Sequence, residues 1–249
     1  MKQILRAISV AAVLAGATVW AQPGGRGGPP GMSASMAKLF GDHKAFTATV
    51  VTTMKGSSDS GPMSMEMKMS MLDGKTRVEM DMSKMKGQGM TPGRAAQMKQ
   101  MGMDKTLNII RPDKKVTYMV FPGMSAYAET AMSDKQVADA MDNSKIEKES
   151  LGKETIDGHS CMKNKVTITS DNGEKHVVLV WNATDLKDFP VQMQIDDDNG
   201  STIVMKYTEI KFDKPEGNLF EPPAGFTKYS STQSLMQGEM MKRAGGGRP

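Results

Sequence analysis

Methionine alternates with polar residues over residues 62–71, PMSMEMKMSM, and this alternation constrains the fold more than any other feature. Neighbouring side chains on a strand point to opposite faces, so Met63, Met65, Met67, Met69 and Met71 share one side. The serine, glutamate and lysine side chains between them share the other side, which suits contact with water. Five exposed methionines would each forgo about 1.5–3 kcal/mol of apolar burial. The stretch therefore predicts a long strand whose methionine face is covered.

Asp73-Gly74 follows this strand and precedes a second alternating run, in which Val78, Met80 and Met82 share a face. A two-residue hairpin turn needs positive φ at both residues, and Asp-Gly or Asn-Gly tolerates it best. The sequence therefore predicts a hairpin here. The same device predicts two later hairpins, with turns at Asn172-Gly173 and Asn199-Gly200.

Alternating or β-branched runs predict about ten or eleven strands in all. They lie at residues 46–52, 63–71, 76–82, 107–110, 116–121, 125–128, 146–151, 166–169, 177–181, 191–195 and 203–212. In the last run the apolar positions change from odd to even numbers, which indicates a bulge near Thr208–Glu209.

Two segments follow a helical pattern instead. Thr91-Pro92 supplies an N-cap and a first-turn proline ahead of Met98 and Met101. Ser133–Gln136 matches a capping box, and Val137, Ala138 and Met141 continue it as an apolar stripe. We therefore expect an α+β domain, mostly β, in which two short helices are inserted into an antiparallel sheet.

The first 21 residues have the features of a secretory signal peptide. Lys2 and Arg6 precede an apolar run at 7–19 that is too short and alanine-rich for a membrane span, and cleavage is expected after Ala21. Ala17 stands where a lipid-modified cysteine would follow Leu-Ala-Gly in a lipoprotein signal. We expect a periplasmic protein without a lipid anchor that does not span the membrane.

The remaining chain divides by composition. A flexible Gly/Pro-rich lead-in is expected at 22–44, the domain at 45–229, and a polar tail, partly helical or disordered, at 230–249. Without residues 1–21 the 32 Lys and Arg become 30, against 28 Asp and Glu, so the charge is near balance. With no Lys/Arg run longer than two and few aromatics, nucleic-acid binding is not indicated. Cys161 is the only cysteine, so no intramolecular disulfide forms.

Three stretches in the C-terminal half, 152–168, 177–195 and 214–229, carry a family likeness. Their order and spacing resemble the periplasmic lipoprotein-carrier superfamily (LolA/LolB-like), and more narrowly a group of uncharacterised secreted domains related to it. The resemblance implies a strongly curved antiparallel sheet, a half-open β-barrel, with two short helices across its concave face. In the carriers that concavity is apolar and holds acyl chains, whereas here its expected lining is rich in methionine.

The leading hypothesis is a non-enzymatic periplasmic binding protein that holds a hydrophobic ligand, such as an acyl chain or a lipid, in a methionine-lined cavity. The residues expected to line it are Met63, Met65, Met67, Met69, Met71, Val78, Met80, Met82, Met98, Met101 and Met141. Ordinary core packing accounts for the same pattern, because methionine fills irregular space. An envelope protein that binds a protein segment is a further alternative.

Thioether sulfur also suits Cu(I) or Ag(I), so a methionine-rich metal-binding protein is another alternative. Five evenly spaced sulfurs specify no single centre, and no histidine lies between His43 and His159, so no metal site or cofactor is assigned. His159 and Cys161 share a strand face but lack a signalled orienting group or oxyanion site. The sequence therefore indicates no enzyme.

Overall fold

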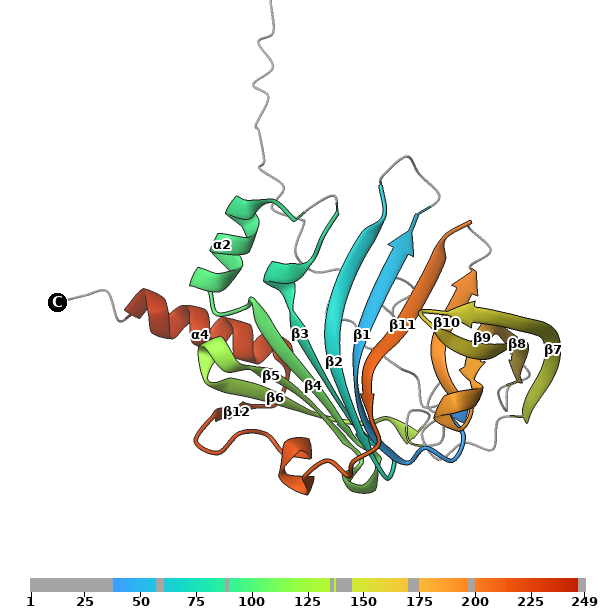
Figure 1. The fold of residues 1–249 in the computed structure, drawn as a ribbon. Coiled ribbons are helices and arrows are strands. Elements are labelled where there is room, and N and C mark those ends of the chain that lie inside the picture. The colour runs from blue at the N-terminus through green and yellow to red at the C-terminus, as the bar shows by residue number, and fades with distance from the viewer. Residues whose placement is uncertain are drawn as a thin grey trace, which may run out of the picture. The chain divides into compact units, whose positions relative to one another are not determined.

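The computed structural model of the protein describes residues 38–56, 61–87, 90–134, 137, 145–169, 175–196 and 200–245. They contain one curved sheet and two helices described from end to end (Figure 1). The strands are β1 (Ala45–Lys55), β2 (Met63–Leu72), β3 (Lys75–Asp81), β4 (Lys105–Arg111), β5 (Val116–Phe121), β6 (Ala126–Ala131), β7 (Lys145–Ile156), β8 (His159–Thr169), β9 (Lys175–Ala183), β10 (Phe189–Asp196), β11 (Thr202–Lys211) and β12 (Thr227–Tyr229). The helices are α2 (Pro92–Gln100) and α4 (Thr232–Gly245).

The sheet has twelve strands in the order β12-β6-β5-β4-β3-β2-β1-β11-β10-β9-β8-β7. Neighbours pair antiparallel, except that β12 pairs parallel with β6. The two edges, β12 and β7, remain apart, so the sheet is open. The predicted fold class, mostly β with a curved open antiparallel sheet and two helices, is confirmed. The short strand β12 was not predicted.

The hairpin at Asp73-Gly74 is confirmed. Leu72 pairs with Lys75, and the two turn residues have φ values of 49° and 80°. β8 pairs with β9 and β10 with β11, as the two Asn-Gly signals predict. Asn172, Gly173 and Asn199 themselves lie outside the described residues.

The predicted bulge in the last long strand is also confirmed. Thr47 pairs with Lys211 and Thr49 with Thr208, so β11 places two residues opposite the single residue between them on β1. Glu209 takes a φ of 51°, which turns the strand at this point.

One face of the sheet, here called the inner face, carries the methionines of β2. Met71 pairs with Phe46 and Met69 with Ala48, and all four are buried. They belong to one buried cluster with side chains of β8, β9, β10 and β11, which lie on the far side of β1 in the strand order. Because strands that are not neighbours in the sheet share this cluster, the sheet curves around it (Figure 1).

The segment before β1 covers part of the inner face. Residues 38–40 form a 3-10 helix, η1 (Lys38–Phe40), inside the range expected as a flexible lead-in. Leu39 and Phe40 are buried, and the Phe40 ring lies 4.8 Å from the Phe46 ring and 5.4 Å from the Phe189 ring, centroid to centroid. These rings form the aromatic part of the core.

Helix α2 begins as predicted, since the Thr91 hydroxyl oxygen accepts a hydrogen bond from the backbone N–H of Arg94 at 3.2 Å. The second predicted helix, from Ser133 to Met141, falls largely outside the described residues. Helix α4 lies in the C-terminal range expected to be a polar tail. Its Leu235 is fully buried against Phe121, Ala126 and Ala128.

Strand register places α4 on the inner face. Side chains of directly paired residues share a face of the sheet. Met69, on the inner face, pairs with Val78, and Val78 pairs with Asn108. Asn108 in turn pairs with Met119, and Met119 pairs with Ala128 of β6. α4 therefore covers the inner face at β6.

The opposite, outer face of β4 and β5 is covered by the chain before β12. Phe220, in the 3-10 helix η6 (Gly217–Phe220), is fully buried against Leu107, Ile109 and Tyr118. Arg111 fixes this segment by donating to the Phe220 carbonyl oxygen at 3.1 Å. Within the described part of the chain, no helix is both long and apolar enough to cross a membrane.

Candidate functional site

The methionines of β2 lie as the alternation predicts. Met65, Met69 and Met71 are buried and Met63 and Met67 are half-buried. Glu66 and Lys68, between them, are exposed on the outer face. The methionine face is therefore covered, and three of its five side chains are part of the core.

The other described residues expected at a ligand surface are half-buried. Val78 and Met80 share the inner face with Met69 and Met67, their direct partners. Met98 and Met101 lie in α2 and at its C-cap. Met141 lies outside the described residues.

Met82 departs from the predicted strand. β3 ends at Asp81, and Met82 begins a 3-10 helix, η2 (Met82–Lys84), instead. The Asp81 carboxylate accepts a hydrogen bond from the backbone N–H of Ser83 at 3.1 Å, which stabilises this turn. A carboxylate two residues before a serine competes with strand pairing in this way.

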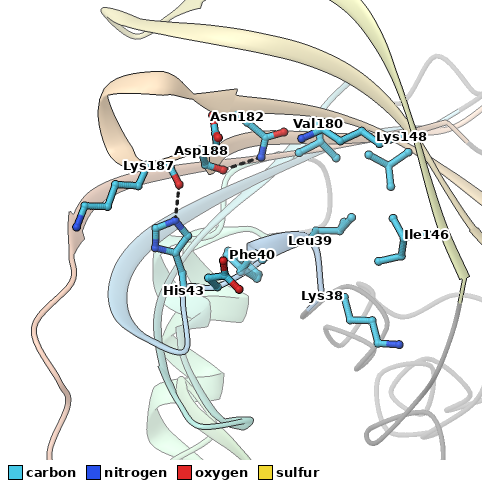
Figure 2. A pocket seen from close by; sticks show the side chains of 13 residues that line it. Lys38, Leu39, Phe40, His43, Ile146, Lys148, Val180, Asn182, Lys187 and Asp188 are labelled. Atoms are coloured by element: carbon cyan, nitrogen blue, oxygen red, sulfur yellow. Dashed lines mark hydrogen bonds between the residues drawn. The ribbon is translucent and has the colours of Figure 1, made fainter.

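A cavity of about 540 Å³ opens on the inner face at the other end of the sheet, between η1 and strands β7, β8 and β9. The residues that line it are Lys38, Leu39, Phe40, Gly41, Asp42, His43, Ile146, Lys148, Val166, Val180, Asn182, Lys187 and Asp188 (Figure 2). Register confirms the face. Val180 pairs with Met193 and Met193 with Met205. Met205 pairs with Thr52, and Thr52 pairs with Met65 of the inner face. We call this space the inner cavity.

The walls of the inner cavity are apolar where η1 faces the edge strand. Figure 2 shows Leu39 and Ile146 on facing walls, with Val180 above them. Val166 and Val180 are buried, and Ile146 is 37% exposed. The cavity therefore has an apolar part, formed by these side chains, beside a polar part formed by the charged and amide side chains of its lining.

Hydrogen bonds hold the polar end of the inner cavity in place. Asn164 donates to the side-chain oxygen of Asn182 at 3.0 Å, and Asn182 donates to the Asp188 carbonyl oxygen at 2.8 Å. The His43 Nε2 atom lies 2.9 Å from the Lys187 carbonyl oxygen. Lys187 and Asp188 both have positive φ, 53° and 60°, so these bonds fix a sharply turned loop.

Three lysines and two aspartates give the inner cavity a small excess of positive charge. In Figure 2 the Lys148 side chain runs along the top of the cavity beside Val180, and Lys38 and Lys187 lie at opposite sides. Asp42 and Asp188 are the acidic lining residues. An apolar surface bordered by ammonium groups is suited to an apolar chain with an anionic end.

Among the described residues, none of those expected to bind ligand lines the inner cavity. No local sequence pattern connects the lining residues, which are 38–43, 146, 148, 166, 180, 182, 187 and 188. Met101 lines a second, smaller cavity of about 130 Å³ beside α4. The ligand-binding role of the β2 methionines stays a prediction.

The Cys161 thiol donates to the backbone carbonyl oxygen of His159 at 3.4 Å, and the His159 imidazole pairs with a different residue. The His159 Nδ1 atom lies 2.7 Å from the Asp185 carboxylate, whose pKa is lowered chiefly by this hydrogen bond. Cys161 is fully buried, and burial raises the pKa of its thiol. A buried thiol with a raised pKa is a poor nucleophile at neutral pH.

A charged cluster lies on the outer face, where η6 meets β4. Arg111, which is buried, pairs with Asp113 at 2.8 Å and with Glu221, and Lys114 reaches Glu221 at 2.8 Å. The hydrogen bond from Arg111 lowers the pKa of Asp113. Burial alone would raise the pKa of Glu221, but hydrogen bonds from Lys114 and Arg111 lower it. This cluster holds the C-terminal segment against the sheet.

Several solved structures are similar to the chain. A LolA superfamily protein from Nitrosomonas europaea is 10% identical, with 76% of this chain and 96% of that chain covered, at a TM-score of 0.40. The MucA/MucB complex of Pseudomonas aeruginosa is 10% identical, with 77% of this chain and 61% of that chain covered, at 0.39. The Mycobacterium tuberculosis lipoprotein LppX is 14% identical, with 73% and 96% covered, at 0.38. A LolA superfamily protein is thus among the similar structures, as the resemblance in the sequence leads one to expect.

No curated protein matches the sequence. A family model, described as a domain of unknown function (DUF4412), matches residues 51–190, which run from β1 to the start of β10. Since this match spans more than half of the 249 residues, the chain belongs to the DUF4412 family.

Proposed function

We propose that this protein is a non-enzymatic periplasmic binding protein that holds a hydrophobic ligand with an anionic end, of the acyl-chain class, in the inner cavity. The observation that carries the proposal is the cavity of about 540 Å³ between η1 and β7, in which an apolar wall of Leu39, Ile146 and Val180 lies beside lysines. Binding sites for small ligands commonly have volumes of about 300–1,000 Å³, a range that includes this cavity.

We include in this proposal a second apolar surface on the inner face, formed by half-buried methionines of β2 and β3 that do not line the inner cavity. Met63, Met67 and Met80 are not fully used by the core, and methionine adapts to ligands of varied shape. Met65, Met69 and Met71 instead serve as core. Export by the signal peptide at 1–21, cleaved after Ala21 and without a lipid anchor, belongs to the same proposal.

The full chain, expressed with its own signal peptide and purified from the periplasm, provides the test. Native mass spectrometry and lipid extraction should find a co-purifying acyl lipid, and a fluorescent fatty-acid probe should bind. The intact mass of the exported protein should correspond to a chain that begins at Gln22.

A matched pair of variants locates the probe. Ile146→Trp fills the inner cavity from β7, and we expect it to weaken probe binding by at least about tenfold. Leu151→Trp lies on the same strand, is similarly exposed at 47%, and does not line the cavity, so it should bind like the wild type. Absence of both lipid and probe binding, or equal losses in the two variants, would count against the proposal.

A further inference from the structure

The second cavity lies between the turn after α2, the 3-10 helix η4 (Pro122–Met124) and α4. Its volume is about 130 Å³, and Glu239 and Arg243 form its polar edge. Its other described lining residues are all methionines: Met101, Met103, Met124, Met236 and Met240. None of them is on β2, and they come from three separate segments. We call this space the methionine pocket.

Two glycines bring the first three methionines together. A Cβ atom on Gly102 would lie 2.5 Å from the Gly123 carbonyl oxygen, so only glycine permits the two backbones to approach this closely. Gly102 also ends α2 with a φ of 68°, and Met103 N–H donates to the Met98 carbonyl oxygen at 2.8 Å. Met101 and Met103 flank one glycine and Met124 follows the other, so this contact sets their side chains beside one pocket.

Helix α4 supplies the remaining two methionines. Met236 and Met240 are four residues apart and share a helix face. Fully buried Leu235 anchors the helix, and Arg243 donates to the Gln100 carbonyl oxygen at 3.1 Å, next to the end of α2. The pocket is therefore held by packing and by a hydrogen bond between its two helices.

The polar edge of the pocket is already engaged within the protein. Glu239 accepts hydrogen bonds from the Tyr229 hydroxyl at 2.8 Å and from Lys242 at 2.7 Å. Among the described residues, no group of three or more His, Cys, Asp and Glu could hold a metal ion. A harder divalent cation therefore has no ligand set here, whereas the thioethers face one small space.

We propose that the methionine pocket binds a soft monovalent metal ion, Cu(I) or Ag(I), through its thioether sulfurs. Thioether sulfur selects these ions over hard cations. Core packing explains Met124 and Met236, which pack against buried residues, but not Met240, which lines the pocket while 59% exposed. An exposed flexible thioether at the mouth can close over an ion that enters from solution. The site is separate from the inner cavity and does not depend on it.

Anaerobic titration of the full chain with Cu(I), in competition with bicinchoninate, tests the site. We expect wild-type protein to take one ion per chain, with sulfur as the only near neighbour in the X-ray absorption spectrum. The triple variant Met101→Leu, Met124→Leu, Met236→Leu keeps the volume and apolar character of the pocket but removes three sulfurs. It should bind Cu(I) at least about tenfold more weakly.

A second triple variant, Met63→Leu, Met67→Leu, Met80→Leu, removes three half-buried inner-face sulfurs elsewhere and should bind like the wild type. Met240→Leu changes only an exposed side chain, so it tests the site even if the pocket triple variant unfolds; it should also weaken binding. Wild-type-like affinity in both pocket variants, loss of binding in the β2 and β3 variant, or nitrogen and oxygen neighbours in the spectrum would overturn the proposal.

Discussion

The backbones of Gly102 and Gly123 are in contact, and a Cβ atom on Gly123 would lie 2.6 Å from the Gly102 Cα atom. This contact joins the end of α2 to η4, two segments that β4 and β5 separate in the chain. Because both partners are backbone atoms, neither can rotate away from an added methyl group. The approach of these segments therefore depends on both residues being glycine.

Gly123→Ala should destabilise the protein by about 1–3 kcal/mol, since the overlap forces the two segments apart. Gly93→Ala is the matched control, because Gly93 lies in α2 with nothing within 4 Å of its would-be Cβ. That change should leave the free energy of unfolding unchanged or raise it by up to about 1 kcal/mol. Urea unfolding followed by circular dichroism measures both. Equal effects from the two substitutions would show that the Gly102–Gly123 contact does not constrain the fold.

Met69→Ala should lower the free energy of unfolding by about 2–5 kcal/mol, because Met69 is fully packed in the main core. Met69→Leu keeps the volume and should cost less than about 1.5 kcal/mol. Met241→Ala, at a position 73% exposed, should change it by less than about 0.5 kcal/mol. A small effect at Met69 would mean that this part of the methionine face borders a hollow rather than a packed core.

Much of the sheet could be predicted from the sequence because its signals are local. Alternation over 63–71 gives the face of each methionine, and Asp73-Gly74 gives the hairpin, without knowledge of distant residues. β12 was missed because a three-residue strand has no period to detect. Its parallel pairing with β6 depends on the C-terminal segment crossing the outer face, which tertiary packing decides.

The candidate site was less predictable for a related reason. Alternation specifies that Met65 and Met69 point inward, but it does not specify what covers them. The inner cavity forms where η1 meets β7, more than 100 residues later in the chain, and the curvature of the sheet brings them together. The methionine pocket likewise depends on a glycine–glycine contact and on α4, so spacing within one segment could not reveal it.

Stability should fall in acid through the Arg111 cluster. The folded-state pKa values of Asp113 and Glu221 are below their ordinary values, so folding favours the charged carboxylates. Their contribution is complete above the unfolded-state pKa, about 4, and is lost as the pH falls through the lower folded-state values. Glu221→Gln should therefore narrow the difference between the free energies of unfolding at pH 7 and pH 3.

Glu216→Gln is the control for this measurement, because Glu216 is exposed on the same segment and lies outside the Arg111 cluster. Its stability should follow the wild-type pH dependence. If Glu221→Gln and the wild type lose the same free energy between the two pH values, the cluster does not contribute to acid sensitivity.

Lys148→Gln should weaken the binding of fatty acids by about two- to fivefold, because an exposed ammonium group contributes modestly to the binding of an anion. The neutral alcohol of the same chain length should bind equally to both proteins, since the apolar walls are unchanged. Lys153→Gln, on the same strand but outside the cavity lining, is the matched control. Competition against the fluorescent probe measures the affinity of each protein for the acid and for the alcohol. When it is repeated at high salt, the loss of fatty-acid affinity caused by Lys148→Gln should become smaller. An equal loss for acid and alcohol would show that Lys148 acts through the shape of the cavity and not through its charge.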